Sequence, residues 1–522
     1  MSELWSPQVS DFRQMFDSAN PWHQTGAVPV EWAPPNRRCL GDTLWQELLQ
    51  LQTRRHLIIL GPRRVGKTTA MYQTVQSLID AGVDSSRLWW LRLDHPLLID
   101  VSLGSLVDQV IESSQATAEN PVFLFLDEVT YSDKWDLWLK TFYDEHYPVR
   151  IVATSSAIAA MRKQGSESGV GRWDERYLAP YLFTEYLDLV SSRSTPLLGQ
   201  FASVLGTTLR TTLETKEAAA SISRIALETS AEPADFGAAD ATRLQRHRLR
   251  YMAMGGFPEL LLRRADALDG TPATILARSQ QMLKSDAIDK ALYKDLPQTF
   301  RVQDPMNLER LLYVLSGQFT GLVDSPRLAR DANLSRPTVD KYLGFFERAF
   351  LVFLLPNFAS TEAAVQRRGR KLFFVDVAVR NAALLRGTQP FSDPGELGLL
   401  NENLVGSHLR TLGMQESVRL YHWRDGKSEV DFVYAHPTHP VAIEVASSGR
   451  HHRRGLDALV ERHPQFDGAT YLTAPNQSWR PARPGEHGQI DLDHLLLTIG
   501  LQAEATQNRT LPTGSESQRL LF

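Results

Sequence analysis

The sequence has 522 residues, of which 43% are hydrophobic and 22% charged, proportions that are ordinary for globular chains. The formal net charge of −4 excludes bulk electrostatic attraction to nucleic acid, so any such contact must come from local basic patches. No apolar run approaches the roughly 18 residues that span a bilayer, so we expect no membrane partner. At about 150 residues per domain, the length predicts roughly three domains.

The N-terminal residues lack the basic start and the continuous apolar stretch of a secretory signal. Cys39 is the only cysteine, which excludes an intrachain disulfide and a zinc site built mainly from cysteines. A chain of this kind suits a reducing compartment. We therefore expect a cytoplasmic protein.

Residues 1–50 are predicted to be an irregular, aromatic-rich leader that ends in a helix. From residue 51 to about 190, short apolar runs alternate with longer amphipathic ones. This order predicts an α/β domain whose parallel sheet is covered on both faces. The predicted strands are HLIIL (56–60), LWWLRL (88–93), VFLFLD (122–127) and RIVATSS (150–156).

A phosphate-binding loop of the form G-x-x-x-x-G-K-[ST] follows the first predicted strand and opens a helix. Its two glycines let the backbone curl so that N–H groups face phosphate oxygens. Lys67 would reach the β- and γ-phosphates of ATP, and the Thr68 hydroxyl would be a ligand of Mg²⁺. The predicted nucleotide-binding residues of the loop are Gly61, Pro62, Arg63, Arg64, Val65, Gly66, Lys67, Thr68 and Thr69.

A second motif ends the buried strand VFLFLD. Asp127 would hold the water shell of Mg²⁺, and Glu128 would orient and polarise the attacking water. The next predicted strand ends in Thr154, Ser155 and Ser156, of which we assign Ser155 to the γ-phosphate. The alternative, a chance loop sequence in a domain that binds no nucleotide, is disfavoured by this second motif at the expected distance.

Residues 191–358 are predicted to be helical, with a Ser-, Thr- and Ala-rich stretch at 191–245. The end of this region has the pattern of a winged helix-turn-helix, with a tight turn at 333–335 and an apolar hairpin after the second helix. The start of that second helix could contact nucleic acid through Arg336, Thr338 and Lys341. Basic clusters at 366–371 and 449–455 support this interpretation. The alternative is a lid or a protein-contact element.

These motifs resemble those of prokaryotic AAA-type P-loop ATPases that carry a C-terminal domain of unknown function. The similarity covers most of residues 50–475 and departs from the family mainly at 191–245. It implies an ATPase domain, a winged helix and a restriction-endonuclease-like α/β domain, here at 359–500, before a flexible tail at 501–522. Segments that carry the resemblance include GPRRVGKTT, LFLDEV, ATSSA, GVGRWDERYLAPYLFTEYL, YMAMGGFPEL, NENLVGSHL and YHWRDGKSEVDFV.

In AAA-type enzymes, an arginine of a neighbouring subunit usually completes the ATP site, which implies a homo-oligomer. Arg172 and Arg176 are the candidates, because they follow the third strand of the ATP site. The alternative is that both line a solvated loop or pair with Asp174 and Glu175.

The nuclease fold that the resemblance implies builds its site from a helix glutamate, a strand aspartate and an E-x-K strand. Glu402, Asp431 and Glu444 match the acids, and a hairpin would place the last two side by side. Such acids hold Mg²⁺, while the lysine positions water and offsets charge on the phosphate. Ala446 stands where that lysine would be.

Three interpretations of this degenerate site stay open. An active nuclease would need a substitute cation from Lys427, Arg450 or His451. A degenerate site could keep metal binding or nucleic-acid docking without cleavage. In a purely structural cluster, Arg424 or Arg450 would neutralise the acids. Because alanine cannot deliver a charge, cleavage is the least favoured of the three.

The sequence therefore predicts a Mg²⁺-dependent ATPase that acts on or with nucleic acid, in genome defence or maintenance. Its C-terminal nuclease-like site is predicted not to cut. The alternative is a nucleotide-switched scaffold whose C-terminal domain contacts a protein partner.

Overall fold

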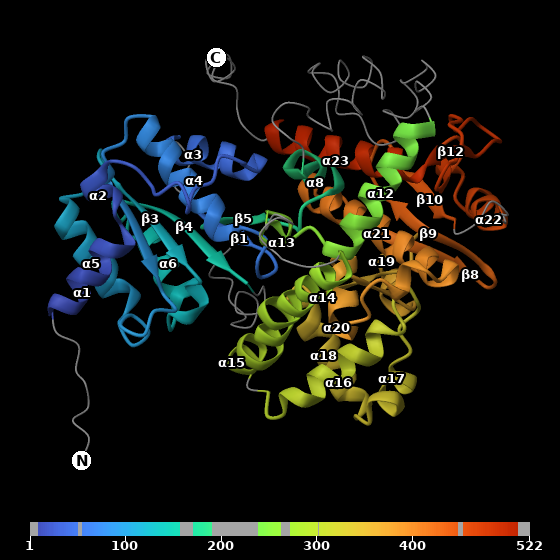
Figure 1. Cartoon of the computed structure of the whole chain (residues 1–522), viewed down its shortest axis with the longest axis horizontal. Coiled ribbons are helices and arrows are strands. Elements are labelled where there is room, and N and C mark those ends of the chain that lie inside the picture. Colours follow the sequence, from blue (N-terminus) through green and yellow to red (C-terminus); the bar gives the residue numbers. More distant parts are fainter. Residues whose placement is uncertain are drawn as a thin grey trace. The chain divides into compact units, whose positions relative to one another are not determined.

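The computed structural model describes residues 9–50, 55–156, 171–190, 238–262, 272–300, 302–446 and 453–509. The chain divides into two compact units, of which the first contains the residues up to Leu178 and the second spans Ala179–Gln507 (Figure 1). Most of the predicted stretch 191–245 lies outside the described residues.

The first unit is built on a parallel five-stranded sheet, ordered β2-β3-β4-β1-β5. Its interior strands β1, β3 and β4 are almost wholly buried, because both faces are covered, and this explains their continuous apolar runs. The four strands predicted from the sequence are confirmed. The strands are β1 (His56–Leu60), β2 (Leu88–Arg92), β3 (Val122–Asp127), β4 (Val149–Ser155) and β5 (Trp173–Tyr177).

Helices cover both faces of this sheet, with α3 and α4 on one side and α5 and α6 on the other (Figure 1). Right-handed crossovers between parallel strands account for this division. The helices are α3 (Cys39–Leu49), α4 (Lys67–Asp80), α5 (Leu103–Ser114) and α6 (Trp135–Asp144), with short 3-10 turns η1 (Ser85–Arg87) and η2 (Val129–Tyr131).

The N-terminal leader is more regular than the sequence predicted. It contains helices α1 (Val9–Ala19) and α2 (Trp22–Thr25). The Trp22 indole donates to the Leu88 carbonyl at 2.8 Å, and the Asn20 side chain accepts from the Trp90 amide at 2.6 Å. Both contacts lie on β2, an edge strand of the sheet. The leader is ordered because its polar groups pair with an edge that would otherwise be open.

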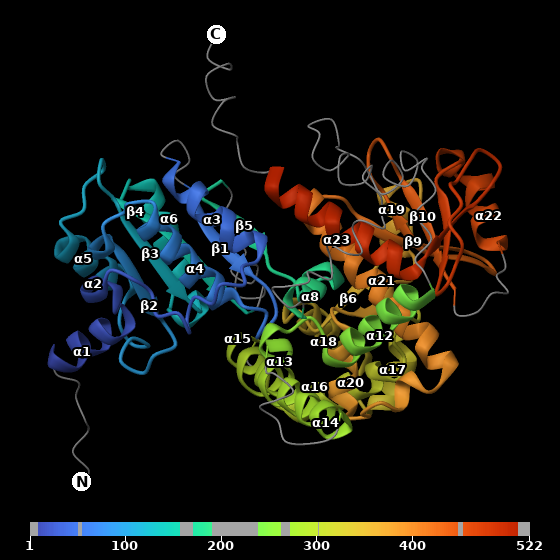
Figure 2. The ribbon, with the colours of Figure 1, turned by 45° about the horizontal axis from the view of Figure 1, so that its top comes forward.

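The second unit is mainly helical in its first half and mixed in its second (Figure 2). Helix α8, which the sequence placed in the ATPase domain, packs on α12 and α13 of this unit. The first-half helices are α8 (Phe183–Val190), α12 (Ala238–Met254), α13 (Pro258–Leu262), α14 (Pro272–Leu283), α15 (Leu296–Phe300), α16 (Pro305–Ser316), α17 (Ser325–Ala332) and α18 (Arg336–Arg348), with π-helical turns η5 (Lys284–Asp289) and η6 (Ala291–Asp295) between α14 and α15.

The two helices of the predicted helix-turn-helix are present as α17 and α18. Asn333 takes a left-handed conformation with φ of 53° and ends α17, and the Ser335 hydroxyl caps α18 by accepting from the Thr338 amide. Strand β6 (Val352–Leu355) then pairs antiparallel with β7 (Lys371–Phe374), across a connection that contains α19 (Glu362–Arg367). The predicted boundary between 358 and 359 therefore falls between two paired strands.

A mixed five-stranded sheet ordered β12-β11-β10-β9-β8 forms the second half. Strands β8, β9 and β10 are antiparallel neighbours, whereas β11 and β12 run parallel to β10. The strands are β8 (Leu420–Asp425), β9 (Ser428–Tyr434), β10 (Val441–Val445), β11 (Thr470–Ala474) and β12 (Gly488–Asp491), and the helices are α20 (Val377–Leu384), α21 (Pro394–Glu416), α22 (Arg454–Arg462) and α23 (Leu492–Arg509), with 3-10 turns η7 (Gln389–Phe391) and η8 (Pro464–Phe466).

The C-terminal helix is longer than the sequence suggested. Helix α23 runs to Arg509, so residues 501–509 are helical where a loose tail was expected, and Ala503 is buried. None of the helices described combines the length and the apolar character that crossing a bilayer demands.

Candidate functional site

The predicted phosphate-binding loop connects β1 to α4 and is tightly curled. A side chain at Gly61 would place its Cβ 2.1 Å from the Leu178 carbonyl oxygen, so this position admits only glycine. Arg64 and Gly66 have φ angles of 67° and 93°, in the left-handed region. These conformations turn the loop back on itself at the N-terminus of α4, where a helix favours anionic groups.

Lys67 lies in the curve of this loop. Its side chain is buried, and its ammonium donates to the carbonyls of Gly61 and Pro62, both at 2.9 Å, and to the Ser156 hydroxyl at 3.4 Å. The ammonium is therefore positioned by the loop itself, beside the place where the loop's amides would hold phosphate oxygens.

Asp127, at the end of β3, lies directly opposite Thr68. The Thr68 hydroxyl is 3.3 Å from both carboxylate oxygens, and the Thr154 hydroxyl donates to one of them at 2.7 Å. Burial and the neighbouring charge of Glu128 raise the pKa of Asp127 to about 6. A hydroxyl beside a buried carboxylate is an oxygen pair that suits Mg²⁺, and a cation there would stabilise the ionised acid.

Glu128 is held in place by the end of the neighbouring strand β4. Its amide donates to the Thr154 hydroxyl at 2.9 Å, and its carboxylate accepts from the Ser156 hydroxyl. Thr154 and Ser156 thus contact the motif residues, and strand alternation directs Ser155 to the other face. The assignment of Ser155 to the γ-phosphate stays a prediction, and Thr154 and Ser156 join it as polar residues at this strand end.

The two candidate arginines form ion pairs within their own chain. Arg172 forms an ion pair with Asp144 at 2.9 Å, and Arg176 with Glu47 at 2.9 Å. Asp174 pairs with Arg55 at 3.0 Å. The Arg172–Asp144 pair has two hydrogen bonds, and both pairs are partly exposed to solvent.

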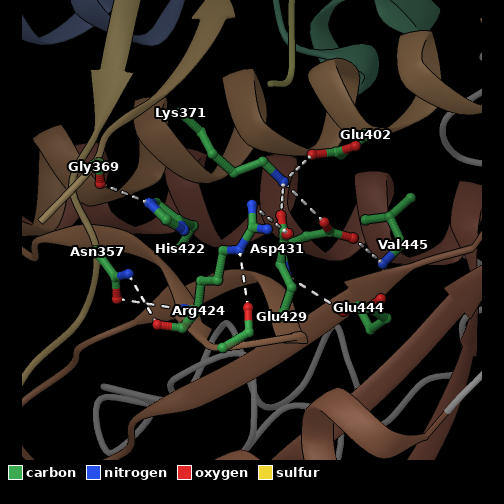
Figure 3. Close-up of polar contacts among 11 residues, drawn as sticks. Asn357, Gly369, Lys371, Glu402, His422, Arg424, Glu429, Asp431, Glu444 and Val445 are labelled. Carbon is green, nitrogen blue, oxygen red and sulfur yellow. Dashed lines mark hydrogen bonds and ion pairs between the residues drawn. The ribbon is translucent and has the colours of Figure 1, made fainter. Parts of the chain in front are cut away.

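The C-terminal acids converge on a lysine that the sequence analysis did not single out (Figure 3). The Lys371 ammonium lies 2.8 Å from Glu402, 2.8 Å from Glu429 and 3.2 Å from Asp431. These partners come from α21 and from alternate positions of β9, and the lysine begins β7. The side chain of Lys371 is 4% exposed.

Asp431 and Glu444 are side by side, as the predicted hairpin requires. The Asp431 amide donates to Glu444 at 3.3 Å, and the Val445 amide donates to Asp431 at 2.9 Å. The antiparallel register that pairs Phe432 with Ile443 places these two acids opposite each other one step further along.

The predicted neutralising residues have other roles. Arg424 is only an outer partner, 3.8 Å from Glu429, and Lys371 neutralises the cluster instead. Lys427 lies in the turn between β8 and β9, whereas Arg450 and His451 lie outside the described residues. Ala446 is buried directly after β10 and brings no charge.

The cluster has unusual proton affinities. Burial, with the charge of Asp431 next, raises the pKa of Glu402 to about 8 and that of Glu444 to about 9. Burial alone would lower the pKa of Lys371, but Asp431, Glu402 and Glu429 outweigh it and raise this pKa well above the ordinary value. Lys371 therefore stays charged, and near neutral pH protons help to neutralise Glu402 and Glu444.

We expect the stability of the second unit to fall as the pH rises from about 5 to about 9. The folded pKa values of Glu402 and Glu444 lie above their ordinary 4.5, so their stabilisation is complete below pH 4.5 and is lost as the pH rises through 8 and 9. The slope would be at most about 1.4 kcal/mol per pH unit for each group. Urea unfolding across this range measures it, and the Glu444→Gln variant should have a shallower slope. An equal slope in that variant would contradict the assignment.

Sequence reasoning missed Lys371 because it treated residues 366–371 as one basic surface cluster. The structure separates them: Arg367, Arg368 and Arg370 are exposed, whereas Lys371 is buried. The available signal was a lysine at the start of an otherwise apolar strand, KLFF. A buried charge in such a strand needs a partner.

The proposed nucleic-acid residues lie at the exposed start of α18. The Arg336 side chain is 68% exposed, 3.8 Å from Asp340, and the Lys341 ammonium lies 5.5 Å above the Phe345 ring. The Thr338 hydroxyl is 2.7 Å from that of Ser335, within the helix cap. Arg336 and Lys341 are thus the exposed cations of this set.

The described residues form no metal centre built from several protein ligands. Within the described ranges, no group of three or more His, Cys, Asp or Glu side chains is arranged to hold a metal ion. A Mg²⁺ ion at Thr68 and Asp127 would not need three such side chains, because Mg²⁺ in nucleotide sites is held largely by phosphates and water.

Comparison with protein families identifies the first unit. Residues 53–187 match the family model of an AAA domain. This part of the chain is similar to AAA domains. Residues 245–390 match a domain of unknown function, DUF8612, and residues 397–479 match another, DUF4143.

Among curated proteins, the chain is similar to two uncharacterized proteins of Methanocaldococcus jannaschii. One is 22% identical over 381 residues, covering 72% of this chain and 71% of the relative. The other is 23% identical over 408 residues, covering 77% of this chain and 78% of the relative. The similarity thus extends well beyond the AAA domain.

Two solved structures show weak likeness. The Aeropyrum pernix ORC1 protein in complex with DNA is 12% identical, with a TM-score of 0.30, over 68% of this chain and 95% of that one. C. elegans PCH-2 is 15% identical, with a TM-score of 0.23, over 47% of this chain and 66% of that one. TM-scores this low carry no weight for the function of this chain.

Proposed function

We propose that the protein is a cytoplasmic, Mg²⁺-dependent ATPase of the AAA type. The observation that carries the proposal is the convergence of Lys67, Thr68, Asp127 and Glu128 at one edge of the parallel sheet. Thr68 lies 3.3 Å from Asp127, and the Ser156 hydroxyl contacts both Lys67 and Glu128. The side chains for phosphate binding, metal binding and water activation therefore occupy one site.

Each residue has a distinct role in this proposal. The loop amides and Lys67 bind the phosphates of ATP, and Thr68 and Asp127 would hold Mg²⁺, which neutralises charge on the phosphates when bound. Glu128 orients and polarises the attacking water, and Ser156 keeps its carboxylate turned toward Lys67. ATP turnover measured alongside molar mass in each nucleotide state tests this proposal.

The ATP site would be completed in a homo-oligomer. Arg172 or Arg176 of one subunit would stabilise charge on the transferring phosphoryl group in its neighbour. Both arginines are partly exposed, and a neighbouring subunit could replace their ion pairs with Asp144 and Glu47.

The proposed partner of the second unit is nucleic acid. The exposed cations of α18, Arg336 and Lys341, lie near the start of a helix that follows a tight turn. The basic segment 367–370 runs beside the chain that leads into α17, because the Val323 amide donates to the Arg370 carbonyl at 2.8 Å. In this proposal, these cations supply the local positive charge on a chain whose net charge is negative. The exposed cations support action on or with nucleic acid, which we place in genome defence or maintenance. In this proposal the C-terminal cluster does not cleave the nucleic acid.

Replacing Arg336 and Lys341 together with alanine should weaken retention of DNA and RNA. If each contacts a phosphate, the slope of log affinity against log salt should fall by about 2. The Asp340→Asn variant is the opposite control, since it removes a competing carboxylate 3.8 Å from Arg336 and should strengthen retention. An unchanged salt slope in the double variant would remove α18 from the interface.

The alternative is a nucleotide-switched scaffold that contacts a protein through its second unit. It is distinguished by ATP turnover measured with and without DNA and RNA. Stimulation by nucleic acid, with retention that weakens as salt rises, supports the first function. Slow ATP turnover that neither DNA nor RNA changes supports the scaffold.

A further inference from the structure

The Lys371 ammonium occupies the centre of the C-terminal carboxylate cluster. Oxygen atoms of Glu402, Glu429 and Asp431 surround it at 2.8, 2.8 and 3.2 Å (Figure 3). Glu444 completes the cluster. Its carboxylate accepts a hydrogen bond from the Asp431 amide at 3.3 Å. Four acids from α21, β9 and β10 are thus gathered around one buried cation.

A divalent ion shared by Glu402, Glu429 and Asp431 would have to lie where the ammonium now lies. Mg²⁺ is held about 2.0–2.1 Å from its oxygen ligands. The carboxylate oxygens could reach such a distance only by closing around the point that the ammonium fills. Two cations cannot share that point, because repulsion between them is strong where water is excluded.

The fold holds this lysine in place through its backbone. Lys371 is paired with Leu355 in the β6–β7 ladder and bridged to Leu322 on its other side. Its ammonium also lies 5.9 Å from the centre of the Phe373 ring. With 4% of the side chain exposed, the lysine cannot leave the acids for solvent unless this part of the unit opens.

We propose that Lys371 is the resident cation of this cluster and excludes divalent metal from it, so that the C-terminal domain is held together without a metal ion. The inference rests on the proposal that the cluster does not cut nucleic acid, and it gives that proposal a physical cause. The site lacks cleavage because a lysine fills the metal position, not because Ala446 fails to supply a lysine.

The arrangement differs from that of a lysine assisting a metal. An assisting lysine would contact the attacking water or the phosphate and leave the carboxylates to the metal. Lys371 instead contacts three of the carboxylates themselves, at ion-pair distance.

The test is binding of Mn²⁺ to the full-length protein without nucleotide, followed by electron paramagnetic resonance. The wild-type protein should bind no Mn²⁺ that depends on Glu402, so the Glu402→Gln variant should match it. The Lys371→Met variant keeps the length of the side chain but removes its charge, and it should bind one additional Mn²⁺ per chain. Adding Glu402→Gln to that variant should weaken the new site on the order of 10-fold or more.

Two further variants serve as matched controls. Lys371→Arg keeps a cation in the cluster and should gain no site. Lys290→Met makes the same chemical change at an exposed lysine that pairs with Asp286 at 2.8 Å, and it should bind Mn²⁺ like the wild type. Circular dichroism of each variant, with and without Mn²⁺, establishes whether it is folded.

Three outcomes would overturn the inference. The first is Mn²⁺ binding by the wild type that Glu402→Gln abolishes, a result that does not require Lys371→Met to fold. The second is a folded Lys371→Met variant that gains no site. The third is Mg²⁺-dependent cleavage of DNA or RNA by the wild type that is lost in both Lys371→Met and Asp431→Ala. ATP turnover, measured on the same samples, reports separately on the ATPase proposal.

Discussion

Replacing Glu128 with glutamine should lower ATP turnover by at least about 100-fold while ATP still binds. Glutamine has the shape of glutamate and can still accept the Ser156 hydroxyl that now contacts the carboxylate. It has no negative charge with which to polarise water. The effect should therefore appear in the rate of hydrolysis and not in the affinity for ATP, which depends on the loop and Lys67.

Steady-state phosphate release and equilibrium binding of ATP measure the two quantities separately. Glu112→Gln is the matched control, because it makes the same change at an exposed position of α5 in the same unit. Turnover at the wild-type rate in Glu128→Gln would show that another residue orients the water. Lost ATP binding in that variant would place Glu128 in the binding step.

Replacing Lys67 with alanine should abolish ATP binding, and turnover should fall with it by at least about 100-fold. The loop itself holds the ammonium, which lies 2.9 Å from the carbonyls of Gly61 and Pro62. Alanine removes the positive charge that the β- and γ-phosphates would contact, and it removes the two hydrogen bonds to these carbonyls.

Equilibrium binding of ATP, with thermal unfolding as a check on folding, tests this result. Lys140→Ala, on helix α6, is a control for the loss of a lysine elsewhere in the same unit. Full ATPase activity in a folded Lys67→Ala variant would end the proposal that this loop is the catalytic site. Together, the two variants separate ATP binding, which we assign to Lys67, from ATP cleavage, which we assign to Glu128.

Much of the ATP site was predictable because its parts are contiguous or end neighbouring strands. The loop is a single stretch from Gly61 to Thr69, and its glycines are needed for local reasons. Asp127 and the polar end of β4 follow strands whose apolar runs could be recognised singly. Parallel strands bring their C-terminal ends to one edge, so motif residues far apart in the sequence meet there.

The details of that edge were less predictable. Strand alternation brings Thr154 and Ser156 to Asp127 and Glu128, whereas the sequence analysis had singled out Ser155. The side of β4 to which each of these side chains points depends on how the strand lies in the sheet, which the sequence does not specify. The partners of Arg172 and Arg176 were likewise unpredictable, because Asp144 and Glu47 lie on other elements of the unit.

The C-terminal cluster divides in the same way. Asp431 and Glu444 could be paired from the sequence, because a hairpin joins their strands and its register follows from the turn. Glu402 was named only through the resemblance to a family, since nothing in its helix distinguishes it from other acids there. Lys371 was not named as part of the site at all.

The sequence by itself determined the chemistry that is local: a phosphate-binding loop, an acid pair at a strand end, and an E-x-x motif that lacks its lysine. Only the tertiary structure decided that the C-terminal acids have a cation. Lys371 precedes Glu402 by 31 residues and Asp431 by 60, and it lies on a strand outside the sheet that carries Asp431 and Glu444. The physical reason is that charge compensation depends on distance in space, which the sequence specifies only where a loop, a hairpin or a strand end keeps residues close.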